Sequence, residues 1–123
     1  MMTIQLPKQH AAYAHCRFQC GIELVLVLFM PCPDTPYELV LLRSLDALPT
    51  DKESFLDADA VDGEVMEYQG DFLENGKSVE LFQCERFYAP TRTHWYDVYA
   101  EVADRTDHFS IELYLSEKTL HYE

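Results

Sequence analysis

The chain has 123 residues, 48% hydrophobic and 13% aromatic, which predicts one domain, 1–123, and excludes intrinsic disorder. Its 22 acidic residues against nine Lys and Arg give a net charge of −13, which excludes direct nucleic-acid binding because that affinity rests on basic groups that neutralise phosphates. The same charge disfavours anionic membrane surfaces, and no apolar run is as long as a membrane-spanning helix.

The first half of the chain predicts a β-hairpin. Even positions of 16–30 are apolar, and the odd positions become apolar in its second half, which predicts one long strand with a bulge or bend at Gly21. Three prolines within 31–36 predict a loop, and 37–45 would return as the second strand. Residues 1–12 have no firm periodicity and predict a lead-in or an edge segment.

One helix is predicted after this hairpin. Thr50 and Glu53 match the capping box, in which the two side chains satisfy exposed backbone N–H groups at a helix start. Gly63 is a residue type that ends helices. We therefore expect a helix near 51–61.

A second hairpin follows, 64–74 with 77–88, joined by Asn-Gly at 75–76, a strong signal for a two-residue turn. This register sets Asp71 opposite Glu80, which is an unfavourable pair of like charges. Either a bulge at the neighbouring glycine shifts the register, or the two carboxylates tolerate each other in water or around a cation.

The last hairpin, 94–103 with 108–116, closes across the turn-forming residues 104–107. One face of this hairpin pairs apolar or aromatic residues only: Val102 with Phe109, Ala100 with Ile111, Val98 with Leu113, and Tyr96 with Leu115. The other face pairs Glu101 with Ser110, Tyr99 with Glu112, and Asp97 with Tyr114. A slip by one residue would turn the apolar set out to water, so the faces are well specified.

These elements predict an α+β fold that is mostly antiparallel. It has about six strands as three successive hairpins, in a twisted sheet or a partly open barrel, with the single helix near 51–61 across it. The strand 108–116 would offer an edge for pairing with a second copy of the chain, so a homodimer is open.

The sequence gives little support for a metal site or for catalysis. His10, His15, Cys16, Cys20 and Cys32 cluster early, but on a strand the first two cysteines would lie roughly 13 Å apart at ~3.3 Å per residue, too far to share zinc. The run 57–63 begins like a calcium-binding loop and then departs from its ligand pattern. No phosphate-binding loop or catalytic motif is present. We expect no metal, no cofactor and no catalytic residues, and more readily a binding protein than an enzyme.

Acidity is concentrated in the middle of the chain, where residues 51–85 hold eleven acids against two lysines. Solubility is one explanation, and attraction to basic partners is the other. The four cysteines are few and unevenly spaced, and the N-terminus lacks a secretory pattern. We expect reduced thiols and a cytoplasmic location, with one disulfide or a metal site as the alternatives.

A binding surface is the leading functional hypothesis, because the polar face of the last hairpin mixes aromatic anchors with carboxylates. The expected partner is a basic protein, such as a nuclease or a nucleic-acid-binding complex, which the chain would inhibit or neutralise as a nucleic-acid mimic. The predicted partner-binding residues are Asp57, Asp59, Asp62, Glu64, Glu67, Trp95, Asp97, Tyr99, Glu101, Glu112 and Tyr114.

Two alternatives stay open. A second layer, such as the 51–61 helix, could cover the aromatic residues and make them part of the core. The chain could also be a small-ligand-binding domain or an enzyme, with its site in a sheet cleft or a barrel mouth.

Overall fold

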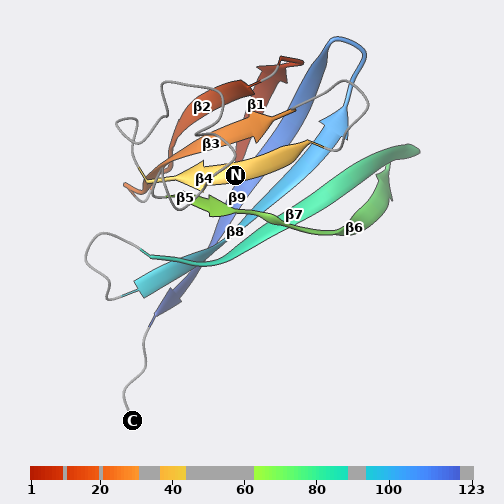
Figure 1. Cartoon of the computed structure of the whole chain (residues 1–123). Coiled ribbons are helices and arrows are strands. Elements are labelled where there is room, and N and C mark those ends of the chain that lie inside the picture. Colours follow the sequence, from red (N-terminus) through yellow and green to blue (C-terminus); the bar gives the residue numbers. More distant parts are fainter. Residues whose placement is uncertain (10, 20, 31–36, 44–62, 89–93, 120–123) are drawn as a thin grey trace.

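The computed structural model describes residues 1–9, 11–19, 21–30, 37–43, 63–88 and 94–119, which form two antiparallel sheets (Figure 1). The five-stranded sheet has, in order, β1 (Met2–Pro7), β9 (His108–Thr119), β8 (His94–Asp104), β7 (Lys77–Tyr88) and β6 (Glu67–Glu74). The four-stranded sheet has, in order, β2 (Ala11–Arg17), β3 (Glu23–Phe29), β4 (Glu38–Leu42) and β5 (Gly63–Val65).

The predicted α+β class is wrong, because the described residues form nine strands in two sheets and no helix. A second sheet, rather than a helix, buries the apolar face of the larger one, which is the other common way to cover a sheet. The helix predicted near 51–61 lies outside the described residues. No helix of the described ranges is long and apolar enough to cross a membrane.

Two predicted strands are each divided in two, which raises the strand count. The 16–30 segment turns at Gly21, whose φ of 88° suits glycine. Residues before the turn end β2, which starts earlier than predicted, at Ala11, and residues after it form β3, which pairs with β2. The 64–74 segment changes sheet at Met66, whose N–H donates to the carbonyl of Leu39 at 2.9 Å. β5 before this point pairs with β4, and β6 after it pairs with β7. The N-terminal segment forms β1, an edge strand.

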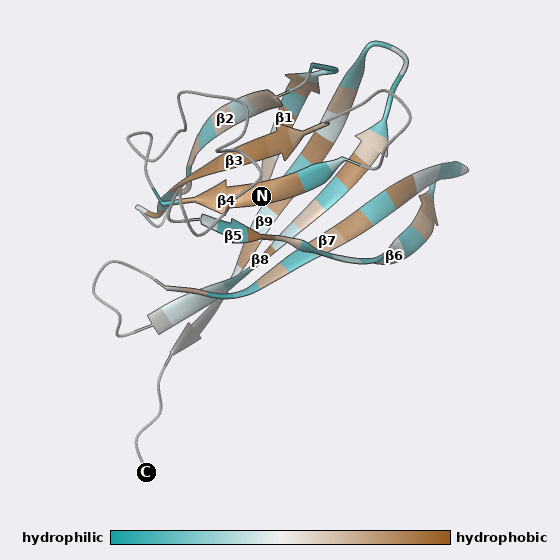
Figure 2. Cartoon of the chain, viewed as in Figure 1, coloured by the Kyte–Doolittle hydropathy of each residue, from teal (hydrophilic) through white to brown (hydrophobic). Residues whose placement is uncertain are grey.

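The core lies between the two sheets. Figure 2 shows hydrophobic residues along most of β3 and β4, whereas hydrophilic and hydrophobic residues alternate along β7, β8 and β9. Accordingly, β3 is buried on both faces from Leu24 to Phe29, as the sequence pattern predicted. Its outward-facing valines pack with two residues of β4 in a separate buried cluster of Val25, Val27, Val40 and Leu42.

β8 and β9 pair two residues away from the predicted register. The structure sets Val98 opposite Leu115 rather than Leu113. The loop explains the difference, because the N–H of Arg105 donates to the carbonyl of His108 at 2.9 Å and closes the turn one residue later than predicted. A shift of two residues keeps every side chain on its predicted face.

The predicted β6–β7 register is confirmed. Asn75 and Gly76 have φ of 53° and 78°, as a two-residue hairpin turn requires. Glu74 lies opposite Lys77, and Asp71 opposite Glu80. A bulge does occur, but between Tyr68 and Gly70, where it leaves the Asp71–Glu80 pair in place.

Candidate functional site

The outer face is the side of the five-stranded sheet that points away from the four-stranded sheet. Because successive side chains of a strand alternate between two faces, the residues that lie between the buried ones of β8 and β9 point to this side. The register aligns them with residues of β7 and β6. The outer face carries Glu67, Glu74, Gln83, Trp95, Asp97, Tyr99, Glu101, Glu112 and Tyr114.

Two stacked tyrosines lie at the centre of the outer face. The observed register places Tyr99 opposite Tyr114, and the rings stack with centroids 5.3 Å apart and an interplanar angle of 15°. Gln83 Nε2 donates to the hydroxyl of Tyr99 at 3.2 Å, and the hydroxyl of Tyr114 donates to Glu101 Oε1 at 3.0 Å. Burial and this bond to Glu101 raise the pKa of Tyr114 to about 12. Both rings are half-buried and held in place, as suits an aromatic anchor.

Three carboxylates gather beside the tyrosines. Glu101 lies opposite Glu112, and oxygens of Glu74, Glu101 and Glu112 all lie within 4.8 Å of one another. Burial, followed by the charges of Glu74 and Glu101, raises the pKa of Glu112. Among the described residues this is the group with the donor set and spacing for a cation, and its oxygen ligands are those that Ca²⁺ or Mg²⁺ take. The same crowding favours basic groups of a protein partner.

Of the acidic residues predicted from the middle of the chain, the structure describes two, Glu64 and Glu67. Asp57, Asp59 and Asp62 lie outside the described residues. Glu67 lies on the outer face opposite Gln83. Glu64 lies on β5, in the other sheet.

Glu64 is engaged in contacts within the fold. Its Oε1 accepts a hydrogen bond from Arg43 Nη2 at 3.0 Å, and its Oε2 accepts one from Cys84 Sγ at 3.0 Å. Arg43 also lies over the ring of Phe87, 5.0 Å from the centroid. Burial and the bond to Glu64 raise the pKa of Cys84, so the thiol keeps its proton and is a poor nucleophile. Glu64 therefore has little charge to offer a partner.

The early His and Cys cluster does not form a zinc site in the described residues. Cys16 points into the core and is fully buried, and burial raises its pKa to about 11. His15, the next residue along the strand, points to the opposite face. The three remaining members of the cluster, His10, Cys20 and Cys32, lie outside the described residues.

A second acidic pair lies on the core-facing side of the β6–β7 hairpin, with partners that the strand pattern does not reveal. The hydroxyl of Tyr68 donates to Asp71, and that of Tyr37 donates to Glu80 Oε2 at 2.9 Å. The bond to Asp71 raises the pKa of Tyr68 to about 12. Burial, followed by the bond to Glu80, raises the pKa of Tyr37. The like charges predicted to repel are thus each stabilised by a tyrosine.

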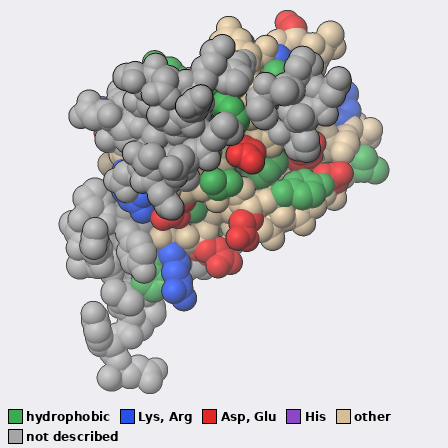
Figure 3. Space-filling view, in the orientation of Figure 1, with side chains coloured by type: hydrophobic (Ala, Val, Ile, Leu, Met, Phe, Trp, Pro, Cys, Tyr) green, Lys and Arg blue, Asp and Glu red, His purple; other side chains and the backbone are tan. Residues whose placement is uncertain are grey.

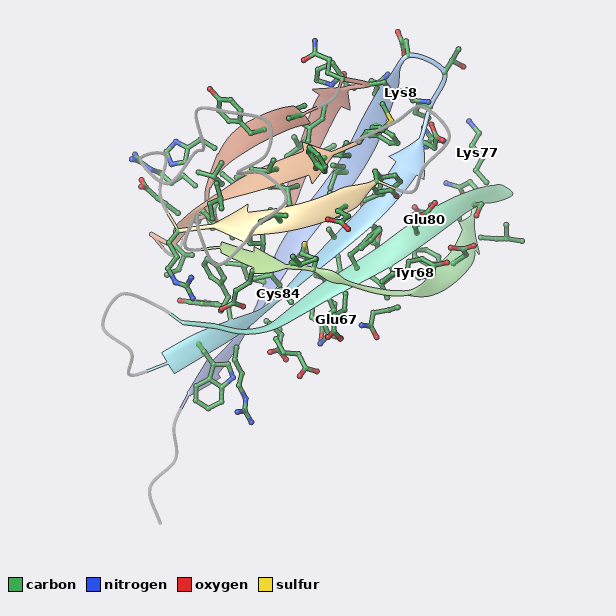
Figure 4. All side chains as sticks on the ribbon, viewed as in Figure 1. Lys8, Glu67, Tyr68, Lys77, Glu80 and Cys84 are labelled. Carbon is green, nitrogen blue, oxygen red and sulfur yellow. The ribbon has the colours of Figure 1, made fainter. Side chains whose placement is uncertain are left out.

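A hollow of about 910 Å³ lies at the end of the sheet where the β6–β7 and β8–β9 turns meet. Figure 4 shows Lys8, Lys77 and Glu80 at this end of the molecule. An ion pair between Lys8 and Asp104 lies beside the hollow. The described lining residues are Gln5, Lys77, Ser78, Glu80, Val102, Asp104, Arg105, Thr106, Asp107, His108 and Ser110.

Comparisons with known proteins do not identify a function, so the functional assignment rests on the geometry of the site. No family model matches the chain, and no curated protein or solved structure matches it.

Proposed function

We propose that this protein is a small acidic binding protein that occupies a basic, nucleic-acid-binding site on a partner protein. It acts without catalysis, as an inhibitor or neutraliser, and presents carboxylates where the partner would bind phosphates. Within the part of the chain that the structure describes, Cys16 and Cys84 are free and buried thiols, which supports action in the cytoplasm, where cysteines stay reduced.

The observation that supports this proposal is the composition of the outer face. The carboxylates of Glu74, Glu101 and Glu112 gather beside the stacked Tyr99 and Tyr114, and Lys77, on the neighbouring turn, lies opposite Glu74. Half-buried tyrosines provide apolar contact area at a small cost in conformational entropy, and the carboxylates provide selectivity for Arg and Lys.

The physical gain has two parts. An acidic surface on a chain of net charge −13 steers a basic partner into encounter, which raises the association rate and makes it dependent on salt. At contact, Glu101 and Glu112 stop repelling each other when a basic group lies between them. Nucleic acid competes for the same Arg and Lys groups, so the two ligands exclude each other.

The test is affinity capture from the native host with two matched variants. The first, Glu101→Gln with Glu112→Gln, removes two charges from the outer face. The second, Glu23→Gln with Glu38→Gln, removes two exposed charges from the four-stranded sheet. We expect wild type and the second variant to capture nucleic-acid-binding proteins, which added DNA or RNA displaces. The first variant should bind them about tenfold more weakly. Capture that is indifferent to nucleic acid, or equal loss in both variants, would refute the proposal.

A second candidate function is a small-ligand site in the hollow at the strand ends. Its volume of about 910 Å³ is suited to a small molecule. Its described lining carries both signs of charge and a single apolar side chain, Val102, whereas small-molecule sites are predominantly apolar. For this reason it ranks second. A thermal-shift screen of charged metabolites, repeated with Arg105→Ala, tests it: a ligand that stabilises wild type and not the variant would favour this site.

A further inference from the structure

β6 is an open edge of the five-stranded sheet. The sheet order ends with β6, and among the described residues only β7 pairs with it. The strand 108–116, from which a second-copy interface was predicted, is β9, and it lies between β1 and β8. Natural sheets protect their edges with Lys, Pro or very short strands. β6 has eight residues with neither Lys nor Pro, and its protection consists of a bulge and three acids.

Apolar side chains are exposed along this edge. Every residue of β6 except Gly70 is exposed, and Leu73 and Tyr68 expose 75% and 55% of their surface. Phe72 and, on the preceding β5, Val65 are exposed as well. Figure 3 shows acidic and hydrophobic side chains mixed along the surface that β6 and β7 form. Large exposed apolar side chains concentrated on one edge are typical of a binding surface.

The hairpin turn determines which backbone groups of β6 are open. In a two-residue hairpin the flanking pair, here Glu74 and Lys77, bond to each other through the backbone. Bonded pairs then alternate along the ladder, so Phe72 also bonds to β7. The N–H and C=O groups of Asp71 and Leu73 point the other way, out of the sheet edge. These are the groups that an added strand would bind.

The charges of β6 select among occupants. Three acidic residues lie along β6: Glu67, Asp71 and Glu74. Figure 4 shows the side chains of Glu67 and Tyr68 on opposite sides of the strand. A second copy paired along β6 would bring these acids close to their own counterparts, which is unfavourable. A strand with Lys or Arg opposite these acids and apolar residues opposite Phe72 and Leu73 would form favourable cross-strand pairs on both faces of the sheet.

We infer that β6 takes an extended segment of the partner as a sixth strand of the five-stranded sheet. This segment carries basic residues opposite the acids of β6 and apolar residues opposite Phe72 and Leu73. The inference rests on the proposed function, since it names how the basic partner is held. The outer face then lies next to the added strand, with Glu74 between the edge and the Glu101–Glu112 pair.

The first test uses a synthetic peptide as long as the eight residues of β6, with lysine opposite each acid of the strand and valine elsewhere. Fluorescence anisotropy is the readout. A peptide with glutamate in place of each lysine should bind at least about tenfold more weakly, because its charges then meet Glu67, Asp71 and Glu74. Two versions of the lysine peptide are N-methylated at odd or at even positions. Strand addition predicts that one version loses binding and the other keeps it, because only alternate N–H groups face β6. Equal behaviour of the two versions would overturn the inference.

Protein variants give a second, independent test. Leu73→Pro removes an N–H that faces away from β7, so the fold should persist while peptide binding falls by about tenfold or more. Leu73→Thr keeps the N–H and should bind within a few-fold of wild type. Hydrogen exchange of the Asp71 and Leu73 amides should slow when the peptide is added. Unchanged exchange, or full binding by Leu73→Pro, would contradict strand addition.

The two proposals fail in different ways. If Glu101→Gln with Glu112→Gln loses the captured partner while Leu73→Pro keeps it, the proposed function stands and the strand addition is wrong. If the lysine peptide behaves as expected but the captured proteins do not bind nucleic acid, the edge site stands and the proposed function is wrong. A concentration-dependent dimer in sedimentation, abolished by Leu73→Pro, would show that a second copy occupies the edge instead.

Discussion

On β8 and β9, every second side chain is buried against the four-stranded sheet, and the side chains between them carry carboxylates and tyrosines. Val98, Ile111 and Leu113 on the core side have no exposed surface. Tyr99 and Glu112 on the outer face are half-buried. Neighbouring residues of one strand thus have different roles, one in the core and the next in the proposed binding surface. Substitutions one position apart should therefore affect stability in one case and partner binding in the other.

The two acidic pairs sharpen this comparison. On the core-facing side of the β6–β7 hairpin, Asp71 and Glu80 each accept a hydrogen bond from a tyrosine. On the outer face, Glu101 accepts such a bond from Tyr114, but Glu112 lies opposite it and Glu74 lies beside them. One pair is stabilised within the fold, and the other keeps an unfavourable charge density that a basic partner can relieve.

The largest expected effect comes from the core side. Leu113→Ala removes a fully buried side chain and leaves a cavity between the sheets, which should lower the free energy of unfolding by about 2–5 kcal/mol. Urea denaturation measures it. Ser110→Ala, on the outer side of the same strand, is the control and should change stability little. Similar losses in both variants would contradict the separation of the two faces.

Tyr37→Phe comes next, because it removes the hydroxyl that donates to the Glu80 carboxylate. A hydrogen bond to a charged group contributes about 1.5–3 kcal/mol, and partial exposure of this one places the loss near the lower end. Since the folded pKa of Tyr37 is raised, the unfolded chain loses its proton first, and wild-type stability falls as pH rises above about 10.

The alkaline decline should therefore be shallower in Tyr37→Phe than in wild type, as denaturation followed against pH would show. Tyr13→Phe, on an exposed tyrosine of β2, provides the control and should follow wild type. A variant curve parallel to wild type at every pH would mean that Tyr37 ionises as readily in the folded protein as in the unfolded chain.

A smaller effect is expected at the tyrosine stack. Tyr99→Leu keeps apolar bulk but removes the stacked ring, which should cost about 0.5–1.5 kcal/mol of stability. Binding of the basic partner should suffer more than stability does, because the ring is a proposed anchor. Tyr114→Phe keeps the ring and loses only the bond to Glu101, so it should bind close to wild type. A Tyr99→Leu variant with full binding would remove the anchor from the proposal.

Much of the strand pattern could be predicted from the sequence, and the parts that could not have physical reasons. Asn75-Gly76 determines its own turn, so the β6–β7 register was correct. The apolar alternation of β8 and β9 recurs every two residues, so a slip by two fits the pattern equally well, and only the geometry of the 105–108 turn decides. The change of sheet at Met66 depends on a contact with Leu39, 27 positions earlier, which no local pattern encodes.

For the candidate site, the sequence predicted which face of the sheet each residue lies on but not which residues lie opposite each other. Alternation correctly assigned Trp95, Tyr99 and Tyr114 to one side, but the two-residue slip hid the Tyr99–Tyr114 stack and the Glu101–Glu112 pair. The open edge at β6 could not be predicted either, because sheet order arises from pairings between distant segments.

The smallest expected effect tests the pair that the sequence did not reveal. Glu112→Gln removes one of two like charges that face each other, so it should raise stability at neutral pH by about 0.2–1 kcal/mol. The folded pKa of Glu112 is raised, so wild type loses stability as pH rises through that pKa, and the variant does not. The gain should therefore vanish below the usual pKa of a glutamate, where Glu112 is protonated in both states. Glu38→Gln, on the other sheet, should show no such pH-dependent gain. A gain that persists at low pH would mean that Glu112→Gln stabilises the fold through packing rather than by removing a charge.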